Sequence, residues 1–414
     1  MKKLLIIAGL AFAFQQAEAQ SAVPTKEISA QVTHPPMGFM TWNYYGDDIN
    51  EKDLREVADA LVSTGLRDVG FNYLFIDDGW QGGRDNKNRM IADPKKFPSG
   101  IKALADYVHS KGLKIGIYSD AAPLTCAGYT ASLGFEELDA KTFADWGMDY
   151  LKYDYCHAPS DWKTAIERYE KMGNALKKSG RNIVFGICEW GDREPWHWAN
   201  KAGGTLWRTT ADVRDKWQSL EKPKGKTDLH RTGAGIIDIL NINADLAKYA
   251  KPGAYNDPDM LLAGLYGKKG PSGDLGGIGA TDTEYQSQMS LWCMMGAPLM
   301  ISLDIKNMNA ATRKILLNKE IIEINQDSKT VQAERIFRND TWQVFVKPLT
   351  NGDVAVAILN TSDRSQPANF LLADLGLYGK SRAKDVWSGK MVNFNKKLNT
   401  KVESHETKVY RFLK

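Results

Sequence analysis

The sequence has little net charge and no long run of lysine or arginine. Its 414 residues include 54 Lys and Arg against 50 Asp and Glu, so the formal net charge is only +4. Domains that bind nucleic acid usually carry a basic patch or stripe. The composition therefore predicts no nucleic-acid partner.

The sequence also lacks the short motifs of several large enzyme classes. No HExxH, P-loop or GxSxG pattern occurs, and the glycine-rich stretch GGIGATDTEY has neither the spacing nor the preceding strand of a nucleotide-binding loop. The six histidines, at positions 34, 109, 157, 197, 230 and 405, do not cluster. A divalent metal ion would have to use carboxylates such as Asp77, Asp78, Asp154 and Asp257, but barrel metal sites usually add histidines or further acids. We expect no metal and no cofactor.

Cysteine is scarce as well. The four cysteines, Cys126, Cys156, Cys188 and Cys293, lie too far apart for a compact zinc motif. They allow three full disulfide pairings, and their spacing does not choose among these.

The only long apolar run lies at the amino terminus. Residues 4–14 are apolar, two lysines precede them, and the small residues Ala17 and Ala19 follow. This pattern predicts a secretory signal that is cleaved after Ala19, because the run is too short to span a bilayer comfortably. We expect an exported protein, periplasmic or extracellular, with no membrane insertion after cleavage, in which disulfides persist.

A strand–loop–helix unit recurs from about residue 37 to 305, within an expected domain of residues 20–327. Apolar residues at three- and four-residue spacing predict helices that end at Gly65, Gly112 and Gly180. Eight short apolar segments alternate with such helices and are expected to be strands, at residues 37–43, 73–80, 114–120, 150–156, 184–190, 205–210, 254–260 and 298–304. Eight alternations predict an α/β fold, the (β/α)8 TIM barrel.

Residues 328–414 have a different periodicity. Apolar residues recur with period two in TWQVFVKPL and DVAVAILNTS, which flank the turn signal Asn351-Gly352. We expect a second, small antiparallel β-domain there.

Polar and aromatic side chains gather where the expected barrel strands end. They are Trp42, Asp77, Asp78, Trp80, Tyr118, Asp120, Lys152, Asp154, Glu189, Trp190, Arg208, Asp257 and Asp259. The carboxyl-terminal ends of the strands form the active-site face of such barrels. Paired carboxylates beside aromatic rings favour glycoside hydrolysis, in which an ionised carboxylate and a carboxylic acid act on the same bond.

The segment DYLKYDYC, residues 149–156, contains one such carboxylate. In a strand, Lys152, Asp154 and Cys156 share one face. The positive charge of Lys152 would keep Asp154 ionised, as a nucleophile requires. A purely structural Lys–Asp ion pair explains the pattern equally well at this point.

The second carboxylate has four candidates, which are Asp78, Glu189, Asp212 and Asp215. The segment WRTTADVRDKW, residues 207–217, places Arg208 and Asp212 where a strand runs into a loop. Arg208 there could hold substrate hydroxyls or a partner carboxylate through its guanidinium group. A surface Arg–Asp pair, which stabilises a protein little, is the alternative.

The motifs resemble those of one family. PPMGFMTWN, FIDDGWQ, GLKIGIYSD, YLKYDYC, CEWG, WRTTADVRDKW and NDPDML occur in the order seen in glycoside hydrolase family 27, the α-galactosidases. The resemblance covers nearly the whole mature chain. It implies a barrel followed by a C-terminal β-sandwich, no cofactor, and a carbohydrate substrate with terminal α-galactose that is hydrolysed with retention of configuration.

The resemblance also implies roles for individual residues. Asp154 would be the nucleophile and Asp212 the acid/base, which calls for a low pKa at Asp154 and a raised pKa at Asp212. The implied sugar pocket comprises Trp42, Asp77, Asp78, Tyr118, Cys126, Lys152, Cys188, Trp190 and Arg208. The implied disulfide joins Cys126 to Cys156. Cys188 and Cys293 would then be free, because Gly79 stands where many relatives have a cysteine.

The implied pocket bears on specificity. In the family, Asp77 and Asp78 would face the 4- and 6-hydroxyls of galactose and Arg208 the 2-hydroxyl. β-L-Arabinopyranosidases of the family replace one carboxylate of the pair by an apolar residue, and α-N-acetylgalactosaminidases use small residues to admit the 2-acetamido group, which the bulky Trp190 would obstruct. Both are alternatives that this sequence disfavours. A non-catalytic galactose-binding protein is a third, against which the two intact carboxylates argue.

Overall fold

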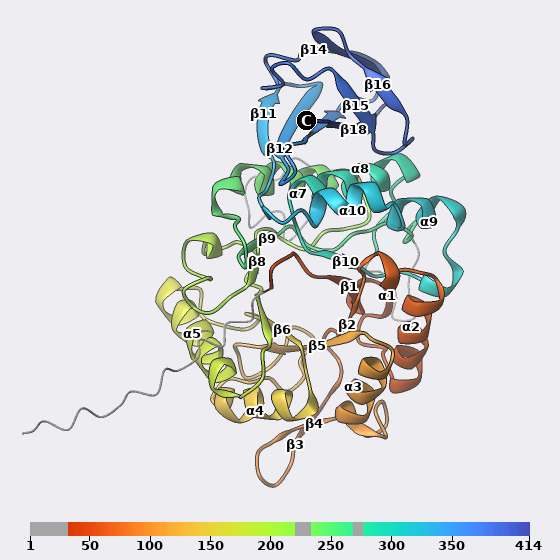
Figure 1. The fold of residues 1–414 in the computed structure, drawn as a ribbon. Coiled ribbons are helices and arrows are strands. Elements are labelled where there is room, and N and C mark those ends of the chain that lie inside the picture. The colour runs from red at the N-terminus through yellow and green to blue at the C-terminus, as the bar shows by residue number, and fades with distance from the viewer. Residues whose placement is uncertain (1–31, 220–232, 268–275) are drawn as a thin grey trace, which may run out of the picture.

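The computed structural model describes residues 32–219, 233–267 and 276–414. The expected signal sequence lies outside these ranges. Within them, a barrel is followed by a β-domain that sits against one side of it (Figure 1). No helix in the described ranges has both the length and the apolar character of a membrane span.

Eight parallel strands form the barrel (Figure 1). They are β1 (Met37–Met40), β2 (Tyr73–Ile76), β5 (Lys114–Asp120), β6 (Tyr150–Asp154), β7 (Val184–Ile187), β8 (Leu206–Arg208), β9 (Tyr255–Asp257) and β10 (Leu299–Ile301). They are neighbours in chain order, and β10 pairs with β1. A parallel bridge between Leu261 and Ile301 closes the ring. The expected (β/α)8 fold is confirmed, although most strands are shorter than predicted because their polar ends turn into loops.

Helices surround the barrel. They are α1 (Trp42–Tyr45), α2 (Glu51–Ser63), α3 (Gly100–Ser110), α4 (Glu136–Trp146), α5 (Trp162–Lys178), α7 (Ile236–Asn243), α8 (Asp282–Met294), α9 (Ala310–Leu316) and α10 (Lys319–Asn325). Short 3-10 helices lie at Arg67–Val69, Pro195–His197, Ala244–Tyr249 and Ile305–Asn307, and a hairpin is formed by β3 (Gln81–Arg84) and β4 (Met90–Ala92). The three predicted helices end as expected, just before Gly65, Gly112 and Gly180, which have φ of 82°, 70° and 86°.

Large side chains fill the barrel interior opposite glycines. Phe75 and Tyr150 are buried at its centre. A Cβ at Gly116 would lie 2.0 Å from the Phe75 ring, and one at Gly186 would lie 2.8 Å from the Tyr150 ring. The interior is therefore a packed core, as in other barrels of this type, and polar chemistry is left to the rim.

The carboxyl-terminal domain is antiparallel, as predicted. Its strands are β11 (Glu334–Arg338), β12 (Trp342–Pro348), β13 (Val354–Asn360), β14 (Gln366–Leu371), β15 (Arg382–Asp385), β16 (Met391–Asn393), β17 (Lys397–Val402) and β18 (Thr407–Phe412). Six of them form a sheet in the order β11-β12-β13-β18-β15-β16, and β14 pairs with β17. The predicted hairpin joins β12 to β13, with Gly352 at φ 88° in the turn. Side chains of both sheets share one apolar core. The domain limits at residues 327 and 328 stay a prediction.

The two domains meet at α8, which contacts β12, β13 and β18. Lys347 of β12 is fully buried at this contact. Its Nζ donates a hydrogen bond of 3.3 Å to the carbonyl oxygen of Cys293 on α8. Burial lowers the pKa of Lys347 to about 8, because the site disfavours the charged form.

We expect Lys347→Met to stabilise the protein at neutral pH. A pKa of about 8 in place of the ordinary 10.5 corresponds to a cost of about 3 kcal/mol for burying the charge. Loss of the bond to Cys293 offsets part of the gain, so the free energy of unfolding at pH 7, measured by denaturant titration, should rise by about 2 kcal/mol. As the pH rises, the folded wild-type protein loses the Lys347 proton before the unfolded chain does. Its free energy of unfolding therefore rises between pH 8 and 10.5, and the advantage of Lys347→Met shrinks. Lys397→Met, at an exposed position of β17, is the control; a destabilised Lys347→Met protein at pH 7 and at pH 10 would contradict this account.

Candidate active site

A pocket opens at the carboxyl-terminal ends of the barrel strands, and we call it the rim pocket. Its lining residues are Trp42, Asn43, Asp77, Asp78, Tyr118, Cys126, Lys152, Asp154, Trp190, Arg208, Asp212, Asp259 and Met260. All residues expected to act in catalysis or sugar binding line it, except Cys188. They converge because parallel strands present their carboxyl ends at the same rim; Tyr118 on β5, for example, pairs in register with Lys152 on β6.

The base of the rim pocket holds a network around Lys152. Its Nζ lies 3.0 Å from Oδ2 of Asp77 and 3.9 Å from Oδ2 of Asp154. The Tyr118 hydroxyl donates to that same Asp154 oxygen at 2.8 Å. The other oxygen of Asp154, Oδ1, is buried and accepts no hydrogen bond of ordinary geometry from the described residues. Asp154 is thus oriented mainly through Oδ2.

The second half of the pocket is organised by Arg208. Its Nη2 lies 3.1 Å from Oδ1 of Asp212 and 3.2 Å from Oδ2 of Asp259. The same Oδ2 of Asp259 accepts the backbone N–H of Val213 at 2.8 Å. Arg208 and Asp259 are buried, whereas the side chain of Asp212 is 46% exposed. Arg208 therefore holds Asp212 at the edge of the pocket, where a ligand can reach it.

The expected pKa directions of the two carboxylates are wrong for the ligand-free protein. Burial raises the pKa of Asp154, and attraction by Lys152 offsets this only in part. At Asp212 burial acts in the same direction, but Arg208 and then Lys152 lower the pKa overall. Because Asp212 is half exposed, its cationic neighbours together outweigh the effect of burial on its pKa. The physical reason for the reversal is that Asp154 is buried, with its cation Lys152 closer to Asp77, whereas Arg208 contacts Asp212 directly.

The other candidates for the second carboxylate have structural partners. Glu189 is fully buried outside the rim pocket, its Oε2 lies 3.0 Å from Nη1 of Arg193, and burial raises its pKa to about 8. Asp215 accepts a hydrogen bond of 2.7 Å from the hydroxyl of Tyr285. Asp78 does line the pocket, and burial raises its pKa to about 6. Asp78 and Asp212 are thus the two of the four that face a ligand.

Three lining residues had no role in the sequence interpretation. Asp259 was expected at the rim, but its contact with Arg208 was not foreseen. Asn43 and Met260 were missed altogether. Each directly follows a rim residue, Trp42 or Asp259, so proximity to the motifs was the signal that pointed to them.

The expected disulfide is present. Cys126 and Cys156 are bonded, with Cα atoms 5.1 Å apart, and Cys188 and Cys293 are free and buried. The Cys126 sulfur lies 3.3 Å from Oδ2 of Asp154, so the bridge forms part of the pocket wall. Ligand-type atoms of Asp120, Cys126, Asp154 and Cys156 lie within 4.8 Å of one another, but sulfurs joined in a disulfide are not thiolate ligands.

Cys188 does not line the rim pocket. It lies in a smaller cavity beneath it, together with Asp257 and Met300, and its thiol interacts with Asp154 from that side. Burial raises the pKa of this thiol, so it stays neutral. Its place in the implied sugar pocket therefore stays a prediction, whereas Trp190 does line the rim pocket.

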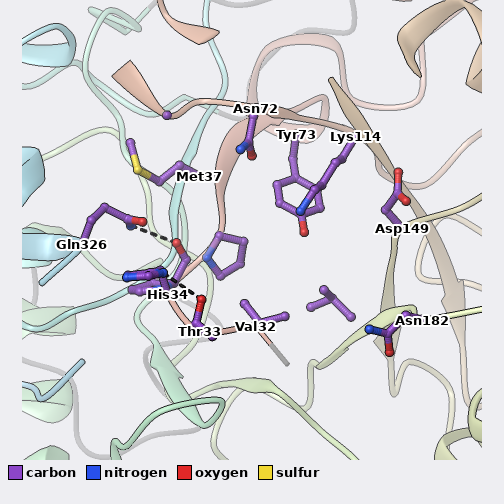
Figure 2. A pocket seen from close by; sticks show the side chains of 14 residues that line it. Val32, Thr33, His34, Met37, Asn72, Tyr73, Lys114, Asp149, Asn182 and Gln326 are labelled. Carbon is purple, nitrogen blue, oxygen red and sulfur yellow. Dashed lines mark hydrogen bonds between the residues drawn. The ribbon is translucent and has the colours of Figure 1, made fainter. Parts of the chain in front are cut away.

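A larger cavity lies at the opposite end of the barrel, where the strands begin (Figure 2). Its volume is about 410 Å³, against about 50 Å³ for the rim pocket by the same measure. Among the described residues, Asp149 is the one carboxylate that lines it, and its oxygens already lie 2.8 Å from His109 and 2.6 Å from Arg181. This cavity is the larger of the two, but the rim pocket brings several carboxylates together and is therefore the candidate active site.

The chain is similar to known proteins over nearly its whole length. The family model described as alpha galactosidase A matches residues 34–327, and that of the alpha galactosidase C-terminal beta sandwich domain matches residues 339–412. Alpha-galactosidase 2 of Arabidopsis thaliana is 41% identical, over 91% of this chain and 88% of the relative. Alpha-galactosidase A of Cellvibrio japonicus (strain Ueda107) is 39% identical, over 99% and 98%. The crystal structure of alpha-galactosidase I from Mortierella vinacea has a TM-score of 0.85 at 34% identity, covering 93% of this chain and 98% of that one.

Proposed function

Because the chain belongs to glycoside hydrolase family 27, the α-galactosidase family, we propose that it is a retaining exo-α-galactosidase that removes terminal α-D-galactosyl residues from oligo- or polysaccharides. The observation that carries the proposal is the rim pocket, in which Asp154 and Asp212 face one ligand site. Trp42 and Trp190 line the same pocket and offer apolar ring faces to a sugar.

In the proposed first step, Asp154 acts as nucleophile. One oxygen of its carboxylate forms a bond to the anomeric carbon as the glycosidic C–O bond breaks, and Asp212 gives its proton to the leaving oxygen. Tyr118 and Lys152 hold the carboxylate in line for attack. The product of this step is a galactosyl ester of Asp154, and the leaving sugar departs as an alcohol.

In the second step, Asp212 acts as base. It takes a proton from a water molecule, whose oxygen attacks the anomeric carbon and releases Asp154 as a carboxylate. Two displacements at one carbon, each with inversion, return the original α configuration.

Substrate binding favours protonation of Asp212, which the first step requires. In the free protein Arg208 holds the pKa of Asp212 low against the effect of burial. A galactosyl residue in the pocket covers the exposed part of Asp212 and removes water, which raises the pKa of the carboxyl group. The 2-hydroxyl of the sugar also competes for Arg208. Once the leaving group has departed, Arg208 again favours the ionised form that acts as base.

Asp77 and Asp78 support galactose as the sugar. Both line the pocket and are buried, and Lys152 and the backbone N–H of Ala127 hold Asp77 and Asp78, respectively, so that their oxygens can accept further hydrogen bonds from the hydroxyls of a ligand. We propose that they accept the 4- and 6-hydroxyls. This favours galactose over β-L-arabinopyranose, which lacks the C6 hydroxymethyl group.

A panel of aryl glycosides tests the proposal. The 4-nitrophenyl α-galactoside should be hydrolysed with a kcat/KM at least about 10²-fold above the β-L-arabinopyranoside and the α-N-acetylgalactosaminide. The first product seen by NMR should be α-galactose. β-Galactose as first product would contradict retention, and binding without hydrolysis would support the alternative of a non-catalytic galactose-binding protein.

We also propose that the protein is exported, either to the periplasm or beyond the cell, with a mature chain that begins at Gln20. The apolar run and the small residues before Ala19 support this. Amino-terminal sequencing of the processed protein tests it.

A further inference from the structure

We propose that His405 of the β-domain positions Asp212, so that the second domain takes part in acid catalysis. This inference rests on the proposed role of Asp212. The residues concerned belong to what we call the acid/base loop, residues 209–219, which leads from β8 to the residues before α7 and carries both Asp212 and Trp217.

The acid/base loop contacts the β-domain through a stacked pair of aromatic rings. His405, in the turn between β17 and β18, lies over the indole of Trp217, with ring centroids 4.5 Å apart and an angle of 14° between the planes. Trp217 is buried, at 7% exposure, while the His405 side chain is 19% exposed. The far end of the acid/base loop is thus covered by a side chain that the barrel does not supply.

The His405 ring has partners that fix its orientation. Its Nδ1 lies 2.7 Å from Oε1 of Glu284 on α8, and its Nε2 lies 3.2 Å from Oδ1 of Asp363 in the β-domain. The carbonyl oxygen of His405 accepts the hydroxyl of Ser287, also on α8, at 2.6 Å. His405 has a positive φ of 57°, which non-glycine residues adopt at a cost, and these contacts hold it there.

The same helix holds the middle of the acid/base loop. Tyr285, the neighbour of Glu284, donates its hydroxyl to Asp215 at 2.7 Å. The backbone of Val213, directly after Asp212, is held by Asp259 at 2.8 Å. The loop is also held by backbone hydrogen bonds to the barrel, such as those of Arg214 with Ala234 and of Trp217 with Ile237, and the ring of Trp217 is the part of it that His405 of the β-domain covers. Movement there is transmitted over a few residues to Asp212.

The test uses His405→Asn. Asparagine accepts a positive φ better than most residues, so the turn is kept while the ring over Trp217 is lost. We expect kcat/KM for melibiose, whose leaving group needs a proton, to fall by about tenfold or more. The kcat/KM for 4-nitrophenyl α-galactoside, whose leaving group needs little protonation, should fall less than about threefold. A loss of stability alone would lower both values equally.

Two further variants make the result decisive. His109→Ala removes another histidine paired with a carboxylate, at 2.8 Å from Asp149 near the opposite end of the barrel, and should not change the ratio of the two kcat/KM values. Asp212→Ala should change it strongly.

If His405→Asn leaves the ratio unchanged while Asp212→Ala shifts it, the positioning role of His405 is wrong and the proposed function stands. If Asp212→Ala does not shift it, the acid/base assignment fails, and with it the role of His405. Should His405→Asn not fold, Trp217→Leu removes the same stack from the other side and carries the same test.

Discussion

Asp154→Asn should lower kcat on every α-galactoside by at least about 10³-fold, because an amide is not a nucleophile that can form the glycosyl ester. The loss should not depend on the leaving group. The amide keeps the size of the side chain and still accepts the hydrogen bond of Tyr118. Steady-state kinetics with melibiose and with 4-nitrophenyl α-galactoside measures the effect.

The protein should remain folded and should still bind galactose. Burial already raises the pKa of Asp154, so removal of its charge does not cost the fold a favourable ion pair, and Lys152 keeps its closer partner, Asp77. Circular dichroism and calorimetric titration with galactose check both points. Glu189→Gln is the matched control, since it makes the same change at a buried carboxylate outside the rim pocket and should keep activity within a few-fold of wild type. Activity of Asp154→Asn near that of the control would overturn the assignment.

Asp212→Ala should separate the two steps of the reaction. The kcat/KM for melibiose should fall by about 10²–10⁴-fold, because its leaving oxygen depends on a proton from Asp212. For 2,4-dinitrophenyl α-galactoside the first step needs almost no acid, so kcat/KM should stay within a few-fold of wild type. The kcat should still fall, because water then lacks its base, and a burst of the released phenol should precede the slow steady state.

Added azide distinguishes loss of the base from general damage to the site. Azide attacks without a general base, so it should restore turnover of the aryl substrate by Asp212→Ala, and NMR should show α-galactosyl azide as the product. Equal losses on both substrates with no effect of azide would contradict the acid/base role of Asp212.

The fold was predictable because its signals are local. Helix endings at Gly65, Gly112 and Gly180 and the hairpin at Asn351-Gly352 are properties of short segments. The rim followed from the rule that parallel strands in a barrel end on the same face. The resemblance of the motifs then implied the roles that local patterns left open, such as the choice of Asp212 among four carboxylates, and these roles are proposals.

What the sequence did not reveal depends on distances between residues far apart in the chain. Burial raises the pKa of Asp154 against the expected direction, and Lys152, which lies 3.9 Å from Asp154 but 3.0 Å from Asp77, offsets this only in part. The contact of His405 with Trp217 joins two domains. No spacing within the segment WRTTADVRDKW or within the β-domain indicates it. Pairwise geometry of this kind emerges only from the folded chain.

Isolation of the galactosyl ester is the most direct test of the account. Asp212→Ala mixed with 2,4-dinitrophenyl α-galactoside should accumulate a covalent intermediate, because the first step proceeds and the second lacks its base. Mass spectrometry of the quenched and digested protein should then find one added galactosyl residue on the peptide that contains Asp154. A galactosyl residue on any other peptide, or a burst of released dinitrophenol with no covalent adduct, would contradict the central claim that Asp154 is the nucleophile of a retaining α-galactosidase.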